Sequence, residues 1–153
     1  MNTDSGFPLW FPFVFVIGWL FTTGLLAFVS DWRHLVTKYL AKGTAIGRTF
    51  YFVSAAIGDS WFPVNYRNCL TFAVGEKGFY VEPSLIFRFL SPRLFILWTE
   101  VETVDIASYW FVQNFRLKLI GTGITFYIFG SAGKAILEYW TASRSSLEMQ
   151  EVS

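Results

Sequence analysis

The chain has 153 residues, which is enough for one domain of ordinary size and an additional segment. Hydrophobic residues make up 54% of it, which is more than a plain soluble domain usually contains. The formal net charge is only +1, and this near-neutral balance argues against a nucleic-acid-binding protein, which usually has a strong basic excess.

Residues 7–29 form an uninterrupted run without a charged side chain or a histidine. As a helix the run would be about 34 Å long, and the hydrocarbon core of a bilayer needs about 30 Å. Trp10 and Trp32 flank the run, as aromatic residues do at the headgroup level. The pattern predicts a transmembrane helix within residues 1–30, with a cleaved signal peptide and a buried core helix as alternatives.

The charges on the two sides of this run predict its orientation. No lysine or arginine precedes the run, whereas several cations follow it within the next twenty residues. The positive-inside rule therefore places the following chain in the cytoplasm and the N-terminus outside.

Residues 31–48 are predicted to be an amphipathic juxtamembrane segment. Apolar residues recur there at the spacing of one helical face, namely Trp32, Leu35, Val36, Tyr39 and Leu40. The cations of the segment are candidate contacts for anionic lipid headgroups, namely Arg33, Lys38, Lys42 and Arg48. A helix packed on the following domain would show the same stripe, so both alternatives stay open.

Residues 49–143 alternate in hydrophobicity over most of their length, which is typical of β-strands. Residues 58–68 contain Gly58, Pro63 and Asn65 and are predicted to form a loop. The uncharged run 119–133 is too short for a second membrane span and holds four glycines, so it is predicted to be strand, turn and strand. The expected strands cover residues 49–54, 69–74, 79–82, 85–90, 94–98, 103–107, 115–119 and 124–129.

After Gly130 the period changes back to that of a helix. Ser131 is a suitable N-cap, and an amphipathic helix is predicted from Ala132 to Ser143, followed by a frayed polar tail over residues 144–153. About seven short antiparallel strands followed by one amphipathic helix predict a curved sheet or partial barrel that the helix closes. The fold class is therefore mainly β with flanking helices.

Two segments carry a resemblance to a known family. The hairpin 69–82, with its return Gly78-Phe79-Tyr80-Val81, and the stretch from Pro92 to Val101 resemble bacterial pleckstrin-homology-like domains of the GRAM type. The chain is also similar to small bacterial membrane-anchored proteins that carry such a domain. This resemblance implies a binding or scaffolding role and a place in the bacterial inner membrane.

Some relatives in this broader fold bind phosphoinositides through a basic loop between their first two strands. In the corresponding residues 58–68 the only cation is Arg67, and the acidic Asp59 lies in the same segment. The resemblance therefore does not extend to that site.

The chain lacks the motifs of common catalytic and nucleotide-binding sites, such as H-E-x-x-H, G-x-S-x-G and the phosphate-binding loop. Glu100, Glu102 and Asp105 could form an acid/base pair or a metal site, but a solvated turn is the favoured interpretation. His34 and Cys69 are each the single residue of their type. We therefore expect no enzyme activity, no cofactor and no metal.

Aromatic residues in two predicted connections are candidate contacts for a partner or a membrane, although they could equally fill the core. They are Trp61, Phe62, Tyr109, Trp110 and Phe111. The sequence thus predicts a membrane-tethered, non-catalytic binding or scaffold module on the cytoplasmic face, bound to a protein partner or anionic lipid. The alternative is an accessory or assembly subunit of a larger membrane complex. Whether the chain binds a small molecule is left open.

Overall fold

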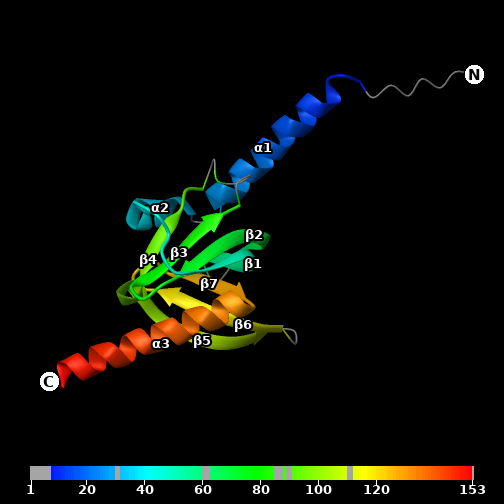
Figure 1. Ribbon diagram of the computed structural model, residues 1–153. Coiled ribbons are helices and arrows are strands. Elements are labelled where there is room, and N and C mark those ends of the chain that lie inside the picture. Colours follow the sequence, from blue (N-terminus) through cyan, green and yellow to red (C-terminus); the bar gives the residue numbers. More distant parts are fainter. Residues whose placement is uncertain are drawn as a thin grey trace, which may run out of the picture.

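The computed structural model describes residues 8–29, 32–59, 63–84, 88, 91–109 and 112–152, with the side chains of all of them except residues 23–29 and Tyr109. Seven antiparallel strands form one curled, half-barrel sheet, and a C-terminal helix lies across it (Figure 1). This confirms the predicted mainly-β class. In chain order the elements are α1 (Phe11–Val29), α2 (Trp32–Tyr39), β1 (Arg48–Asp59), β2 (Val64–Val74), β3 (Gly78–Pro83), β4 (Leu94–Leu97), the 3-10 helix η1 (Trp98–Glu100), β5 (Val101–Tyr109), β6 (Val112–Leu119), β7 (Ile124–Phe129) and α3 (Ser131–Glu151).

The strands are ordered β4-β3-β2-β1-β7-β6-β5, so β1 lies at the centre of the sheet. β1 pairs with β2 from Arg48 to Ile57, but with β7 only from Ala55 to Asp59. The register with β2 shifts on both sides of Val53. Such bulges bend a strand and increase its twist, which is how one long strand can serve both halves of a curled sheet.

Two residues with positive φ mark these bulges. Phe52 has a φ of 55° and Asn68, on β2, has a φ of 49°. Asparagine tolerates this conformation, and the Ser54 hydroxyl stabilises it by donating to Asn68 Oδ1 at 2.9 Å and accepting from the Asn68 N–H at 3.0 Å. A bulky aromatic residue rarely adopts it, so Phe52 is the strained position of the sheet.

The core lies on the concave side of the sheet, around Phe79. The Phe79 ring contacts those of Phe72, Trp98 and Phe126, at centroid distances of 6.2, 5.5 and 6.4 Å. All four rings are buried. The first turns of α3 add Ala132, Ala135 and Ile136 to the same cluster, so the C-terminal helix closes the sheet with its apolar face, as predicted.

The apolar face of α2 packs into the same core. Trp32, Leu35 and Tyr39 are at most 6% exposed, and the Trp32 indole N–H donates to the Pro92 carbonyl at 3.2 Å. The prediction that Trp32 lies at the headgroup level is therefore wrong, because its ring fills the edge of the domain core. Of the two alternatives for this segment, the structure shows the helix packed on the domain.

α2 is also shorter than the predicted amphipathic stretch. It ends at Tyr39, because Leu40 forms a β-bridge with Leu94 and the Ala41 N–H donates to the Arg93 carbonyl at 3.1 Å. These contacts place α2 beside edge strand β4, on the open side of the half-barrel.

α1 begins at Phe11, inside the uncharged run, and projects away from the sheet (Figure 1). Over the part of the chain that the structure describes, no helix is both long enough and apolar enough to cross a membrane.

Three local predictions need correction. The loop expected over residues 58–68 is mostly strand, since β1 continues to Asp59 and β2 starts at Val64. The N-cap of α3 is Gly130 rather than Ser131, and the helix continues to Glu151 through the expected polar tail. Of the strand expected over residues 85–90 only Arg88 is described, and it lies in a turn.

Candidate functional site

A cluster around Glu100 ties α2 to the sheet. Lys38 Nζ lies 2.6 Å from Glu100 Oε2, and the Tyr39 hydroxyl donates to the same oxygen at 3.0 Å. The hydrogen bonds from Lys38 and Tyr39 hold the pKa of Glu100 below its usual value, and the bond to Glu100 raises the pKa of Lys38 to about 12. Burial raises the pKa of Tyr39. None of these three pKa values is thus shifted towards neutral pH, where the pKa of an effective general acid or base lies.

The four cations predicted to contact lipid are not gathered in one place. Lys38 pairs with Glu100, Arg33 is exposed on α2, and Lys42 is exposed in the connection to β1. Arg48 opens β1, and its guanidinium lies over the Phe50 ring at 5.2 Å. Contact with lipid stays a prediction for all four.

The predicted aromatic contacts cannot be placed as side chains. Trp61, Phe62, Trp110 and Phe111 lie outside the described residues, and Tyr109 is described only as the last backbone position of β5.

A small polar cavity lies between the sheet and the connection from α2 to β1. It has a volume of about 200 Å³, and Glu82 and Arg93 are among the residues that line it. Arg93 Nε lies 2.6 Å from Glu82 Oε2, and Arg93 also donates to the Gly43 carbonyl at 3.4 Å. The cavity is smaller than the roughly 300 Å³ at which ligand pockets usually begin, so we assign the ion pair to holding the connection in place.

A larger groove runs beside the first half of β1, and we call it the β1 groove. It has a volume of about 590 Å³ and is lined by residues 49–54 of β1, Asn68 of β2, and residues 129–132 at the junction of β7 and α3. Tyr51 and Phe52 are adjacent in sequence, yet both are largely exposed there, 69% and 74% respectively. The bulge explains this, because a regular strand would turn one of the two rings to the other face.

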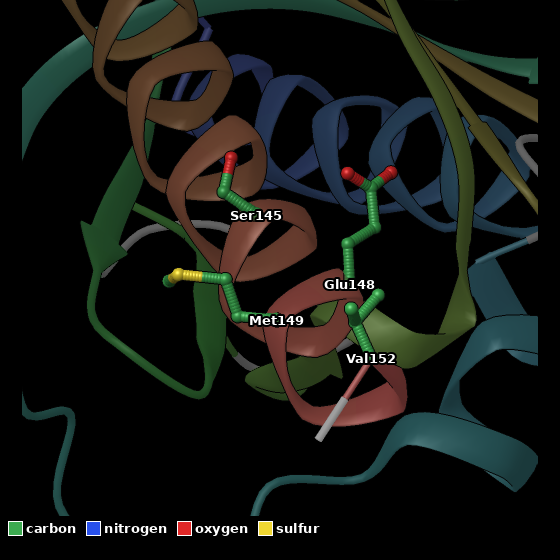
Figure 2. A pocket seen from close by; sticks show the side chains of 4 residues that line it. All are labelled: Ser145, Glu148, Met149 and Val152. Atoms are coloured by element: carbon green, nitrogen blue, oxygen red, sulfur yellow. The ribbon is translucent and has the colours of Figure 1, made fainter.

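A third depression, of about 630 Å³, lies along the last turns of α3. Figure 2 shows its four lining residues, Ser145, Glu148 and Met149 on α3 and Val152 at its C-cap, with Glu148 and Met149 pointing away from each other. A surface formed by one helix has no opposing wall, so we do not treat it as a site.

Two of the three carboxylates considered for catalysis form ion pairs. Glu100 is paired with Lys38, and Asp105 forms an ion pair with Arg116 at 3.3 Å. Cys69 is half-buried on β2, and burial raises the pKa of its thiol, which opposes formation of the nucleophilic thiolate. No group of three or more potential metal ligands occurs among the described residues.

No family model matches this chain, and no curated protein shows a significant sequence match to it. The geometry of its surface is therefore the basis for the functional proposal.

Sequence reasoning missed the β1 groove, although one signal was present. The run Phe50-Tyr51-Phe52 places three aromatic residues in succession. In a strand with one buried face, alternation leaves at least one of them on the solvent side, so the run indicates either a bulge or an exposed aromatic surface.

Proposed function

We propose that this chain is a membrane-tethered, non-catalytic binding module, in which α1 is the tether and the β domain is the part that binds. The observation that carries the proposal is the exposure of α1. Eleven apolar side chains from Leu9 to Phe21, nine of them in α1, are at least 37% exposed, although the domain has a core of its own. An exposed apolar surface of this size marks contact with a membrane or a protein.

The composition of α1 supports the bilayer as its environment. A helix that is apolar on all sides is suited to a membrane span. A helix that binds in a groove of one partner protein needs only one apolar face. No membrane span is found over the described residues, and the described side chains of α1 end at Thr22; in the sequence, residues 23–29 extend the uncharged run to Val29.

The position of α2 supports a short tether. Only residues 30–31 separate α1 from α2, and the first residue of α2, Trp32, is already in the domain core. Under this proposal the domain is held at the end of the membrane helix, with Arg33 and Lys42 close to the headgroups.

The curved sheet and its C-terminal helix fit a pleckstrin-homology-like fold loosely. We propose membership of that broad fold group, whose members bind protein or lipid ligands. Fold alone does not establish a function, so the ligand must be argued from the surface.

Alkaline extraction of bacterial membranes that contain the full-length chain tests the tether. We expect the wild-type chain to stay in the membrane pellet and an Ile17→Asp/Leu20→Asp variant to be released, because each aspartate in the middle of a span costs about 3 kcal/mol. Leu147→Asp, on exposed α3, is the matched control and should stay in the pellet. Release of the wild-type chain would refute the tether.

Labelling with a membrane-impermeant maleimide tests the orientation. In a Cys69→Ser background, Thr3→Cys should react in intact spheroplasts, and Glu148→Cys only after the membrane is permeabilised. The reverse pattern would contradict a cytoplasmic domain.

A further inference from the structure

β1 has an unpaired edge along its first half. From Arg48 to Val53 its other edge pairs with β2, whereas the pairing with β7 starts only at Ala55. At Gly130 β7 gives way to α3, so no described strand continues the sheet beside this stretch of β1. The β1 groove therefore lies beside a stretch of strand edge that has no described strand partner and that could take a further ladder.

Beyond Arg48, this edge lacks the usual protection. Natural proteins guard exposed edges with lysine, proline or other charged residues that disfavour pairing. Residues 49–54 read Thr-Phe-Tyr-Phe-Val-Ser and contain neither a charge nor a proline. Their composition strongly favours strand pairing, so an edge left open in water would promote aggregation.

Phe52 adds a second, independent observation. Its positive φ is strained, yet its ring is not buried by the domain, so no core contact offsets the cost. The bulge instead presents Tyr51 and Phe52 together at the groove, where flat aromatic rings can cover a bound chain.

The charges of residues next to the groove lining favour an acidic occupant. None of the lining residues is acidic, and Arg48, Arg67 and Lys134, all exposed, lie within two residues of lining positions. The first turn of α3 likewise has no acidic residue. A second copy of this chain would bring two such cationic sets together, which opposes self-pairing.

We propose that the β1 groove binds an extended, acidic peptide segment of a partner protein, which adds to the edge of β1 as a further strand. Backbone hydrogen bonds to residues 48–54 give affinity, the aromatic pair covers the peptide, and the surrounding cations select acidic side chains. About six residues of peptide would span this edge. This inference rests on the proposed function, because it names the ligand class of the binding module.

The test uses the full-length chain in detergent and three fluorescein-labelled heptapeptides. One alternates valine and glutamate, one alternates valine and lysine, and one is the acidic peptide with a central proline, which cannot complete a ladder. We expect measurable binding of the acidic peptide by anisotropy, binding at least about tenfold weaker for the basic peptide, and none for the proline peptide. Amide hydrogen exchange of residues 49–54 should slow when the acidic peptide binds.

Two variants and a control separate the groove from general charge effects. Phe52→Gly should weaken acidic-peptide binding about tenfold while keeping the fold, since glycine accepts the positive φ. Lys134→Glu should weaken it about threefold and reduce its salt dependence, whereas Lys77→Glu, in the exposed β2–β3 turn, should leave it unchanged.

The inference is overturned if the basic peptide binds as well as the acidic one, if protection on binding falls outside β1, or if Phe52→Gly binds like the wild type. If the chain dimerises and Phe52→Gly abolishes the dimer, the edge of β1 is a self-association surface and not a peptide site. Membrane extraction of the same variants separates the two proposals. Lost peptide binding with retained membrane attachment refutes only the peptide site, and a chain that leaves the membrane but binds peptide refutes only the tether.

Discussion

Lys38 Nζ lies 2.6 Å from Glu100 Oε2, and this contact joins α2 to the 3-10 helix that leads into β5, 62 residues later in the chain. The Tyr39 hydroxyl donates to the same carboxylate. Edge strands β4 and β5 do not pair with each other but are joined by this 3-10 helix, so the cluster fixes α2 to the connection between the two edges of the sheet. It holds α2 against the domain.

Neutralising Glu100 should change how stability depends on pH. The pKa of Glu100 is lowered in the folded chain. The ion pair of Glu100 therefore contributes to stability at a pH above 4.5, the usual pKa of this group, and the contribution is lost as the pH falls through the lowered pKa. The folded pKa of Lys38 is raised, so its contribution is complete below 10.5 and is lost as the pH rises through about 12.

We therefore expect Glu100→Gln to lower the melting temperature modestly at pH 7 and to lose less stability than the wild type on acidification. The effect is modest because both side chains are at least one-third exposed and thus screened. Thermal unfolding by circular dichroism at pH 7 and pH 3 measures it. Glu102→Gln, at an exposed neighbouring position, is the control. Equal melting temperatures of the two variants would contradict a stabilising role for the contact between Lys38 and Glu100.

Removing the Phe79 ring should be among the most costly single substitutions in the domain. The ring is fully buried and contacts three other aromatic rings, so Phe79→Ala loses its burial and leaves a cavity, at about 3–5 kcal/mol. Phe95→Ala is the control on the outer face, where the ring stacks on Tyr80 and is only partly buried, and it should cost about 1 kcal/mol. Denaturant unfolding measures the free energy of unfolding of both variants. Similar losses in the two would contradict a core centred on Phe79.

Gly78→Ala should destabilise the domain for a steric reason. A Cβ atom on Gly78 would collide with the Ile96 carbonyl oxygen and lie 2.9 Å from Leu97 Cα, and neither backbone atom can move without disturbing the pairing of β3 with β4. We expect a loss of about 1–3 kcal/mol in the free energy of unfolding. Lys77→Ala, at the exposed adjacent position, should change it by less than about 0.5 kcal/mol. A neutral Gly78→Ala would show that β4 can move away from β3.

The Cys69 thiol should react slowly with iodoacetamide at pH 7.5 in the folded chain. Burial raises its pKa and restricts access, so we expect its rate to be at least about tenfold below that in denaturant. In a Cys69→Ser background, Ser108→Cys gives an exposed reference thiol on β5, which should react at nearly the denatured rate. Fast alkylation of folded Cys69 would contradict its burial and reopen the question of a reactive thiol.

Much of the fold follows from local pattern alone. Alternation in residues 69–82 and 115–129 predicted the two hairpins, because a strand with one buried face must alternate. The return to helical spacing after Gly130 predicted the closing helix. Polar residues such as Asn65 and Arg67 concealed the start of β2, since edge-facing and outward positions of a strand need no apolar side chain.

The sequence by itself determined the strand and helix periods and the long uncharged run before Trp32, because each of these is a property of neighbouring residues. The tertiary structure decided which surface each apolar stripe covers. The apolar stripe of α2 would suit lipid or protein equally. Only the folded domain shows that Trp32 and Leu35 are buried in protein. The pairing of Lys38 with Glu100 and the unpaired edge of β1 were equally beyond local pattern, because both depend on how distant strands curl around one core.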